Sequence, residues 1–186
     1  MYKKLFMTAA FMAACIQTNA QTLASEYKGT SNNNPISPCV YCADPTALEY
    51  NGRLYVYGSN DHQQFIKNGK KGTNEYGDIK SFVVLSTDDM VNWTFHGTID
   101  VAKLCTSWGG GFFRSWAPSV TWRHNETTGK DEFFLYFANW ASNVGVLTAD
   151  SPLGPWKSPL TKALVSGDTP VVSPCNWRFD PGVVID

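Results

Sequence analysis

The sequence has few charged residues, almost no net charge and no long apolar run after its first residues. Lysine, arginine, aspartate and glutamate make up 17% of the 186 residues, and the formal net charge is −1. A chain with this balance has no basic surface for a nucleic acid or an anionic membrane, so we expect neither partner. We also expect no membrane span, because a span needs about 20 consecutive apolar residues.

The apolar stretch near the N-terminus is too short to cross a bilayer and has the features of an export signal. Residues 5–15 are apolar, two lysines precede them, and small residues stand just before Gln21. This pattern predicts a signal peptide over residues 1–20, followed by a lead-in segment over residues 21–37. The mature protein is therefore expected in the periplasm, on the cell surface or outside the cell. A lipoprotein signal that ends at Cys15 is the alternative.

Histidine is scarce as well, and the cysteines lack the spacing of a complete metal site. The chain has three histidines, so we do not expect His62 to act as a nucleophile or as a metal ligand. Cys39 and Cys42 form a pair, but Cys105 and Cys175 stand alone, and a zinc site needs a second ligand pair. We therefore predict no bound metal. In an exported chain these four cysteines could instead form two disulfides, with three possible pairings.

Apart from the N-terminal segment, the sequence lacks the periodicity of helices and shows short runs that are typical of strands. These runs hold β-branched and aromatic residues and are bounded by turn residues, such as Asn51-Gly52. The first set of predicted strands covers residues 46–48, 54–57, 82–86 and 93–96. The second set covers residues 119–123, 132–138, 144–148 and 156–158. The chain is thus predicted to be all-β.

The two sets of strands follow one plan, and a third set begins near the C-terminus. Each set opens on a residue before proline, namely Asp44, Ala117 and Asp180. In the two complete sets a tryptophan, Trp93 or Trp156, stands on the fourth strand and is expected to be a blade-packing residue and not a ligand contact. Four strands in each repeat are the signature of β-propeller blades.

The repeats predict that residues 38–186 hold about two propeller blades and the start of a third. The first blade is longer than the second because of a polar surface loop at residues 67–78. A propeller needs at least four blades to close its ring. The chain is therefore expected to be the N-terminal part of a longer protein.

Two acidic residues at equivalent blade openings are the candidates for chemistry. The first strand of a blade lines the central channel, so Asp44 and Asp180 are expected at one mouth of that channel. Proline biases the residue before it toward extended backbone, which would hold both aspartates in the same way. Carboxylates gathered in an aromatic-lined cleft are the groups that hydrolyse glycosidic bonds. Taken singly, each Asp-Pro pair could be no more than a turn.

Several segments resemble glycoside hydrolase family 43, in the order of that family and from about Pro38 to the last residue. They are Ala43-Asp44-Pro45, Leu54-Tyr55-Val56-Tyr57-Gly58-Ser59, residues 86–93, Trp116-Ala117-Pro118-Ser119-Val120, Leu153-Gly154-Pro155-Trp156 and residues 179–186. The resemblance implies a five-bladed β-propeller that hydrolyses arabinose- or xylose-containing plant polysaccharides or oligosaccharides by an inverting mechanism. A non-catalytic carbohydrate-binding propeller is the alternative, and it would not need two carboxylates at equivalent openings.

The resemblance also implies roles for particular residues. Asp44 matches the general base, and Asp180 matches the carboxylate that modulates the pKa of the general acid. The acid itself is a Glu in the fourth blade of the family, beyond residue 186, so this chain alone is expected to be inactive. Trp116 and Phe179 match walls of the sugar-binding pocket.

Two further polar residues follow second strands of the repeats. Asp61 and Asn139 could bind sugar hydroxyls or could simply cap turns. No cofactor is expected with certainty, although some members of the family hold a calcium ion in the central channel. The expected partner is a plant cell-wall polysaccharide or oligosaccharide.

Overall fold

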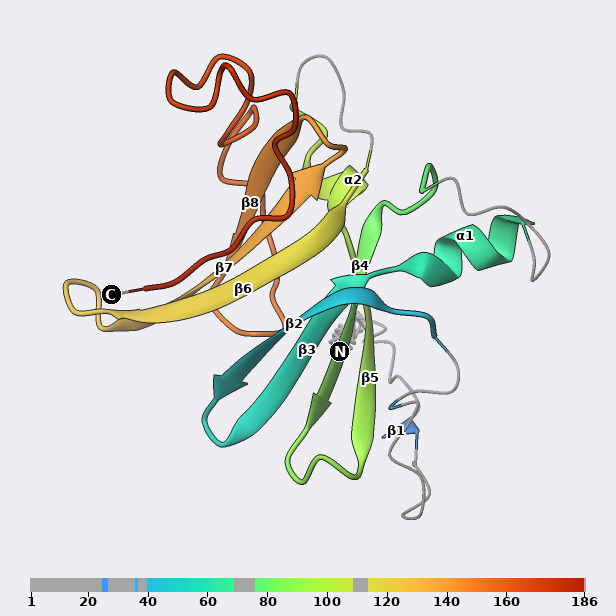
Figure 1. Cartoon of the computed structure of the whole chain (residues 1–186). Coiled ribbons are helices and arrows are strands. Elements are labelled where there is room, and N and C mark those ends of the chain that lie inside the picture. Colours follow the sequence, from blue (N-terminus) through green and yellow to red (C-terminus); the bar gives the residue numbers. More distant parts are fainter. Residues whose placement is uncertain (1–24, 27–35, 37–39, 69–75, 109–113, 186) are drawn as a thin grey trace, which may run out of the picture.

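The computed structural model describes residues 25–26, 36, 40–68, 76–108 and 114–185. They form two antiparallel β-sheets with two short helices, so the all-β prediction is confirmed (Figure 1). The predicted signal peptide over residues 1–20 lies outside the described residues and stays a prediction. In the described ranges, no helix has the length and apolar character that crossing a membrane requires.

The first sheet is the first predicted blade, a meander of four strands. Its strands, each paired with the next, are β2 (Ala43–Tyr50), β3 (Arg53–Ser59), β4 (Ser81–Thr87) and β5 (Trp93–Asp100). A short edge strand, β1 (Ser25–Glu26), pairs with β5. Asn51 and Gly52 have φ angles of 53° and 77°. Positive φ at both positions is what a two-residue hairpin turn requires, so the predicted turn between β2 and β3 is confirmed.

The second sheet is the second predicted blade, but it has three strands where four were expected. These are β6 (Trp116–Asn125), β7 (Lys130–Asn139) and β8 (Asn143–Ala149). The predicted fourth strand at residues 156–158 is reduced to one backbone bridge, between Thr148 and Lys157. Pro155 and Pro159 flank this segment, and proline has no N–H group to donate to a strand ladder.

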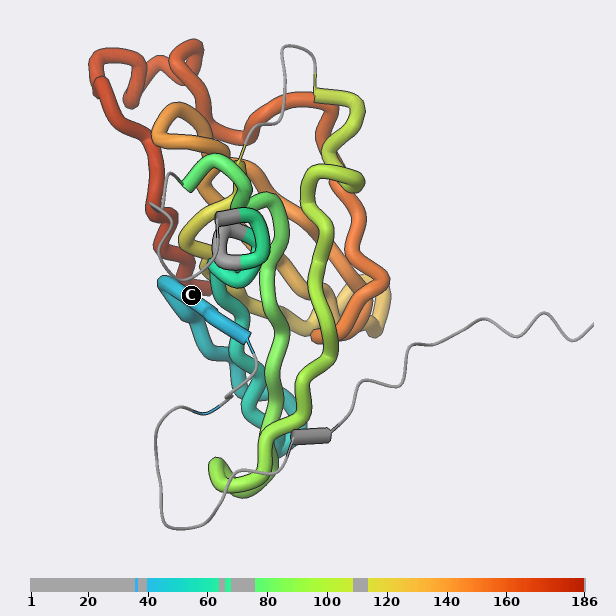
Figure 2. The backbone as a smooth tube through the Cα atoms, turned by 90° about the vertical axis from the view of Figure 1, so that its right-hand side faces the viewer, coloured from blue at the N-terminus to red at the C-terminus, as the bar shows by residue number. Residues whose placement is uncertain are grey.

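The two blades share one hydrophobic core. Both β2 and β3 contact β6, so the first strands of the two blades lie next to each other, as strands around a channel should. The rings of Phe82 in blade one and Phe137 in blade two meet with centroids 6.2 Å apart. Trp156 is buried against Tyr57 of the other blade, and Trp93 is buried inside blade one, so both predicted packing roles are confirmed. Figure 2 shows the first sheet, in blue to green, extending below the second, in yellow to orange.

Two short helices were not predicted from the sequence. α1 (Asp61–Asn68) follows β3 directly and reaches into the predicted loop at residues 67–78. Its first turn carries Asp61, and a negative charge there is favourable beside the N-terminal end of the helix dipole. α2 (Val101–Leu104) is a single turn after β5, and the side chain of Asp100 caps its N-terminus.

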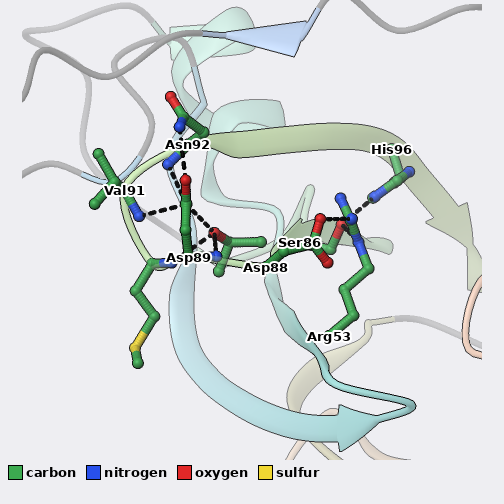
Figure 3. Close-up of polar contacts among 9 residues, drawn as sticks. Arg53, Ser86, Asp88, Asp89, Val91, Asn92 and His96 are labelled. Carbon is green, nitrogen blue, oxygen red and sulfur yellow. Dashed lines mark hydrogen bonds and ion pairs between the residues drawn. The ribbon is translucent and has the colours of Figure 1, made fainter.

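A polar cluster joins three strands at the end of blade one where β3 begins and β4 ends (Figure 3). Arg53 Nε donates to the hydroxyl of Ser86 at 2.9 Å, and that hydroxyl lies 2.6 Å from Nε2 of His96. Arg53 also pairs with Asp88, and Asp89 accepts hydrogen bonds from the backbone of the following turn. Since Ser86 is fully buried, this cluster ties the strands together and offers no accessible nucleophile.

The cysteines of the described residues are not joined in disulfides. Cys42, Cys105 and Cys175 are free thiols, and Cys39 lies outside the described residues. The two disulfides that the sequence permitted are therefore not formed in this structure. Burial raises the pKa of the Cys42 and Cys105 thiols to about 11. Within the described ranges, no group of three or more His, Cys, Asp and Glu side chains could hold a metal ion.

Candidate active site

A cavity of about 320 Å³ lies where the first blade meets the start of β6 and the C-terminal segment. Five of its lining residues were singled out from the sequence, namely Asp44, Asp61, Trp116, Phe179 and Asp180. The lining is completed by Ala43, Ser59, Tyr76 and Ile79. Three carboxylates and three aromatic rings, drawn from both blades and from the segment after them, thus surround one hollow.

The three blade openings share an uncommon backbone conformation. The φ angles of Asp44, Ala117 and Asp180 are 47°, 42° and 51°. All three lie in the left-handed region, so the prediction that the following prolines hold these residues extended is wrong. The strand pairing slips at the first two openings, and such bulges take a residue out of the regular strand path. A left-handed backbone costs about 1–2 kcal/mol for a residue other than glycine.

At two places a serine hydroxyl of one blade accepts a hydrogen bond from the backbone at the opening of the next blade. The hydroxyl of Ser59, which is buried at the end of β3, accepts a hydrogen bond of 2.9 Å from the backbone N–H of Ala117. The hydroxyl of Ser119 on β6 accepts a hydrogen bond of 3.1 Å from the backbone N–H of Val183. These bonds help to fix where each opening stands relative to the blade before it.

Arg178 anchors the segment that carries Phe179 and Asp180, and reasoning from the sequence missed it. Its backbone N–H donates to the carbonyl of Ala141 at 3.1 Å, and its Nε donates to the carbonyl of Ser142 at 2.8 Å. Its Nη1 donates to a carbonyl earlier in the same segment. Arg178 therefore fastens this segment to the turn between β7 and β8. A lone arginine between two aromatic residues was the available signal.

The carboxylates of the cavity influence one another. Burial raises the pKa of Asp61 above its usual value, and the negative charge of Asp44 raises it further. The pKa of Asp180 is raised by the same two causes, in the same order. The thiol of Cys42 beside the cavity responds to burial first and then to the charges of Asp61 and Asp44. The negative charge of Asp44 thus contributes to the raised pKa of all three neighbouring groups, Asp61, Asp180 and Cys42.

Aromatic side chains form the apolar part of the cavity wall. The indole N–H of Trp116 donates to the backbone carbonyl of Tyr76 at 3.3 Å, and the two rings meet edge to face at 5.9 Å. Phe179 is half exposed and contacts the ring of Trp177. Tyr76 was missed because it belongs to the segment that the sequence predicted as a polar loop.

Asn139 does not line the cavity. Its side chain is fully buried, and its Oδ1 accepts a hydrogen bond of 3.1 Å from the backbone N–H of Arg114. This hydrogen bond ties the end of β7 to the chain that leads into β6.

The fold and the cavity together define a class of protein. It is an all-β protein built of propeller blades, with carboxylates and aromatic rings gathered at the blade openings. Within that class the chain belongs to the glycosyl hydrolases family 43, whose family model matches residues 32–186. The predicted partial propeller is confirmed, with the two sheets as its first two blades.

Curated relatives and solved structures give the same grouping. The arabinoxylan arabinofuranohydrolases of Bacillus subtilis and Paenibacillus polymyxa are each 43% identical to this chain, over 90% and 83% of its length. The chain spans 33% and 25% of these two relatives. The crystal structure of the Bacillus subtilis enzyme in complex with cellotetraose matches with a TM-score of 0.75 and 42% identity, over 87% of this chain and 34% of that one. An α-L-arabinofuranosidase from Clostridium thermocellum matches with a TM-score of 0.61 and 41% identity, over 85% of this chain and 48% of that one.

Proposed function

We propose that the protein is a glycoside hydrolase that cleaves arabinose- or xylose-containing plant polysaccharides or oligosaccharides with inversion at the anomeric carbon. One observation carries this proposal: Asp44 and Asp180, from different blades, line one cavity together with Trp116 and Phe179. Carboxylates placed around a sugar-sized hollow are what glycosidic hydrolysis requires. The names of the two curated relatives support arabinoxylan as the substrate class.

Asp44 acts as the general base that takes a proton from the attacking water. Its side chain is exposed at the cavity wall, so water reaches it without crossing the core. In an inverting site the base and the acid stand ~6.5–9.5 Å apart, which leaves room for that water. The acid is the Glu that the family resemblance assigns to the fourth blade, outside residues 1–186.

Asp180 keeps that general acid protonated. A negative charge beside an acid disfavours its ionisation and raises its pKa. Arg178 on one side, and the bond from Val183 to Ser119 on the other, hold the chain around Asp180. Burial, and then the negative charge of Asp44, raises the pKa of Asp180, so the two carboxylates already influence each other across the cavity.

Three other lining residues hold the sugar. Trp116 and Phe179 offer apolar ring surfaces to the C–H face of a sugar, and Asp61 offers a carboxylate to its hydroxyls. Asn139 contributes through the backbone that it supports. Because the substrate is a plant cell-wall polymer, the protein works outside the cytoplasm, and the predicted signal peptide at residues 1–20 provides for its export.

Substitution of the general base tests the proposal. In the whole protein, Asp44→Asn keeps the size of the side chain but removes its basicity, so we expect kcat on arabinoxylan to fall about 10²–10⁴-fold. Release of arabinose would be measured by ion chromatography, with Asp150→Asn, an exposed change away from the cavity lining, as the matched control. Wild-type turnover in Asp44→Asn would remove Asp44 as the base.

A wild-type protein that binds the polymer and releases no sugar would overturn the hydrolase proposal. That result would favour the non-catalytic carbohydrate-binding propeller instead. Screening on small arabinosides and xylosides would then show no turnover either, which separates this outcome from a mistaken choice of polymer.

A further inference from the structure

The aromatic surface at the cavity continues beyond the cavity wall. Trp116 lines the cavity, and its ring lies 5.2 Å from the ring of Trp140, which is not part of the lining. Trp140 is 42% exposed, and Tyr76, which also contacts Trp116, is 55% exposed. We call Tyr76, Trp116 and Trp140 the outer aromatic surface.

The blade repeat explains why Trp140 stands at the cavity mouth. The first strand of blade one pairs with β3 as far as Ser59, and the first strand of blade two pairs with β7 as far as Ala138. Two residues further along the chain stand Asp61 and Trp140. Asp61 lines the cavity, so its equivalent in blade two belongs to the same mouth.

Neighbouring residues hold the side chain of Trp140 in a half-exposed position, and its backbone is left-handed. Its φ angle is 57°, in the left-handed region that residues other than glycine seldom adopt. The guanidinium of Arg114 lies 4.7 Å from the centre of its ring. The two flanking residues are fixed as well, since Asn139 accepts from Arg114 and Ala141 accepts from Arg178. These contacts hold the indole ring of Trp140 in place beside the ring of Trp116.

We propose that Trp140 forms, with Tyr76 and Trp116, a second sugar-binding surface that takes a main-chain unit of the polysaccharide whose side-chain unit fills the cavity. The inference rests on the proposed function and adds a specificity-determining residue to it. A sugar ring is uncharged and has an apolar C–H face, which suits an indole ring.

The size and position of the surface favour a sugar over a protein partner. A stable protein interface buries about 800 Å² on each side, whereas three adjoining rings match one or two sugar units. Trp116 belongs both to the cavity and to the outer aromatic surface. A single polymer can therefore occupy both at once, and binding at the second surface makes the polymer a better substrate than a small glycoside.

Kinetics on two substrates test the inference in the whole protein. We expect Trp140→Ala to raise KM for arabinoxylan about 10-fold with kcat nearly unchanged, the loss of one well-packed aromatic contact. For 4-nitrophenyl α-L-arabinofuranoside, which is small enough to occupy the cavity alone, kcat/KM should stay within about twofold of wild type. Trp140→Phe keeps a ring and should recover part of the affinity for the polymer.

Met90→Ala is the matched control. Met90 is exposed and has the same φ angle of 57°, but it lies in the turn after β4, away from the cavity lining. This variant should leave both substrates unaffected. If Trp140→Ala slows both substrates equally, Trp140 supports the cavity and does not bind the polymer, and the inference falls. It falls as well if the polymer KM does not change.

Binding without hydrolysis separates this inference from the proposed function. The Asp44→Asn protein should bind unsubstituted xylohexaose in calorimetry, and addition of Trp140→Ala should weaken that binding about 10-fold. If wild type binds xylohexaose through Trp140 but hydrolyses no glycoside, the proposed function fails while the second surface stands. If wild type hydrolyses arabinosides and Trp140→Ala leaves xylohexaose binding unchanged, the second surface fails alone.

Discussion

The residues at the openings of blade one and blade two have the same backbone conformation but different side chains. Asp44 and Ala117 have φ angles of 47° and 42°, each precedes a proline, and each stands where the strand pairing slips. Asp44 brings a carboxylate to the cavity, whereas Ala117 does not line it and is held through its backbone by Ser59. The left-handed backbone is therefore a feature of every repeat, whereas the side chain at this position differs between blades according to its function. Strained backbone alone does not mark a catalytic residue in this protein.

The largest expected difference between the openings is in activity. Asp180→Asn in the whole protein removes a negative charge beside the general acid, so the pKa of that acid should fall. We expect kcat to drop about 10²-fold or more, and the alkaline limb of the pH profile of kcat/KM to move to lower pH. Asp168→Asn, an exposed change earlier in the same segment, is the control and should alter neither quantity. A lower kcat with an unmoved alkaline limb would argue against modulation of the acid.

The bond between the blades can be broken without touching a carboxylate. Ser59→Ala leaves the half-buried backbone N–H of Ala117 without its acceptor, and the hydroxyl that is lost is itself buried. We expect the free energy of unfolding to fall by about 1–3 kcal/mol. Ser119→Ala removes the corresponding bond to Val183, and it should cost less because the hydroxyl of Ser119 is only partly buried. Urea denaturation of the whole protein would measure both, and equal losses would show that burial does not set the strength of these contacts.

The sequence predicted the blades and five residues of the cavity lining, but not the backbone conformation that directs their side chains toward the cavity. Hairpin turns and alternating apolar residues depend on neighbours in sequence, which is why β2 to β8 could be located in advance. The left-handed angle at Asp44 depends on a slip between β2 and β3, a contact between strands that overrides the local preference set by proline. The anchoring by Arg178 depends on carbonyls about 36 residues away along the chain, which no local pattern reveals.

A smaller effect should separate strain from function at the two openings. Gly adopts positive φ without the steric cost of a Cβ atom. Ala117→Gly and Asp44→Gly should therefore each stabilise the whole protein, or change it little, by at most about 1 kcal/mol. Only Asp44→Gly should abolish hydrolysis. Clear destabilisation by Ala117→Gly in thermal unfolding would show that the left-handed backbone is not strained at that opening.

The smallest expected effect compares one histidine in each blade. Burial, and then the positive charge of Arg53, lowers the pKa of His96 in blade one. Its contribution to stability is therefore full above the unfolded value of 6.5 and is lost as the pH falls through the lower folded value. In blade two the hydrogen bond to Asp131 is the main cause that raises the pKa of His124. Its contribution is full below 6.5 and is lost as the pH rises through the higher folded value.

These opposite signs give a test that needs no enzyme assay. His96→Asn should reduce the free energy of unfolding more at pH 8 than at pH 5, because the neutral imidazole beside Ser86 and Arg53 is the favoured form. His124→Asn should show the reverse order, with a small amplitude because that ion pair is exposed and screened by water. Urea unfolding of both variants at several pH values would measure the two slopes. Slopes of the same sign would mean that folding does not shift the pKa values of the two histidines in opposite directions. The buried polar cluster of blade one and the exposed ion pair of blade two would then not differ in how they depend on pH.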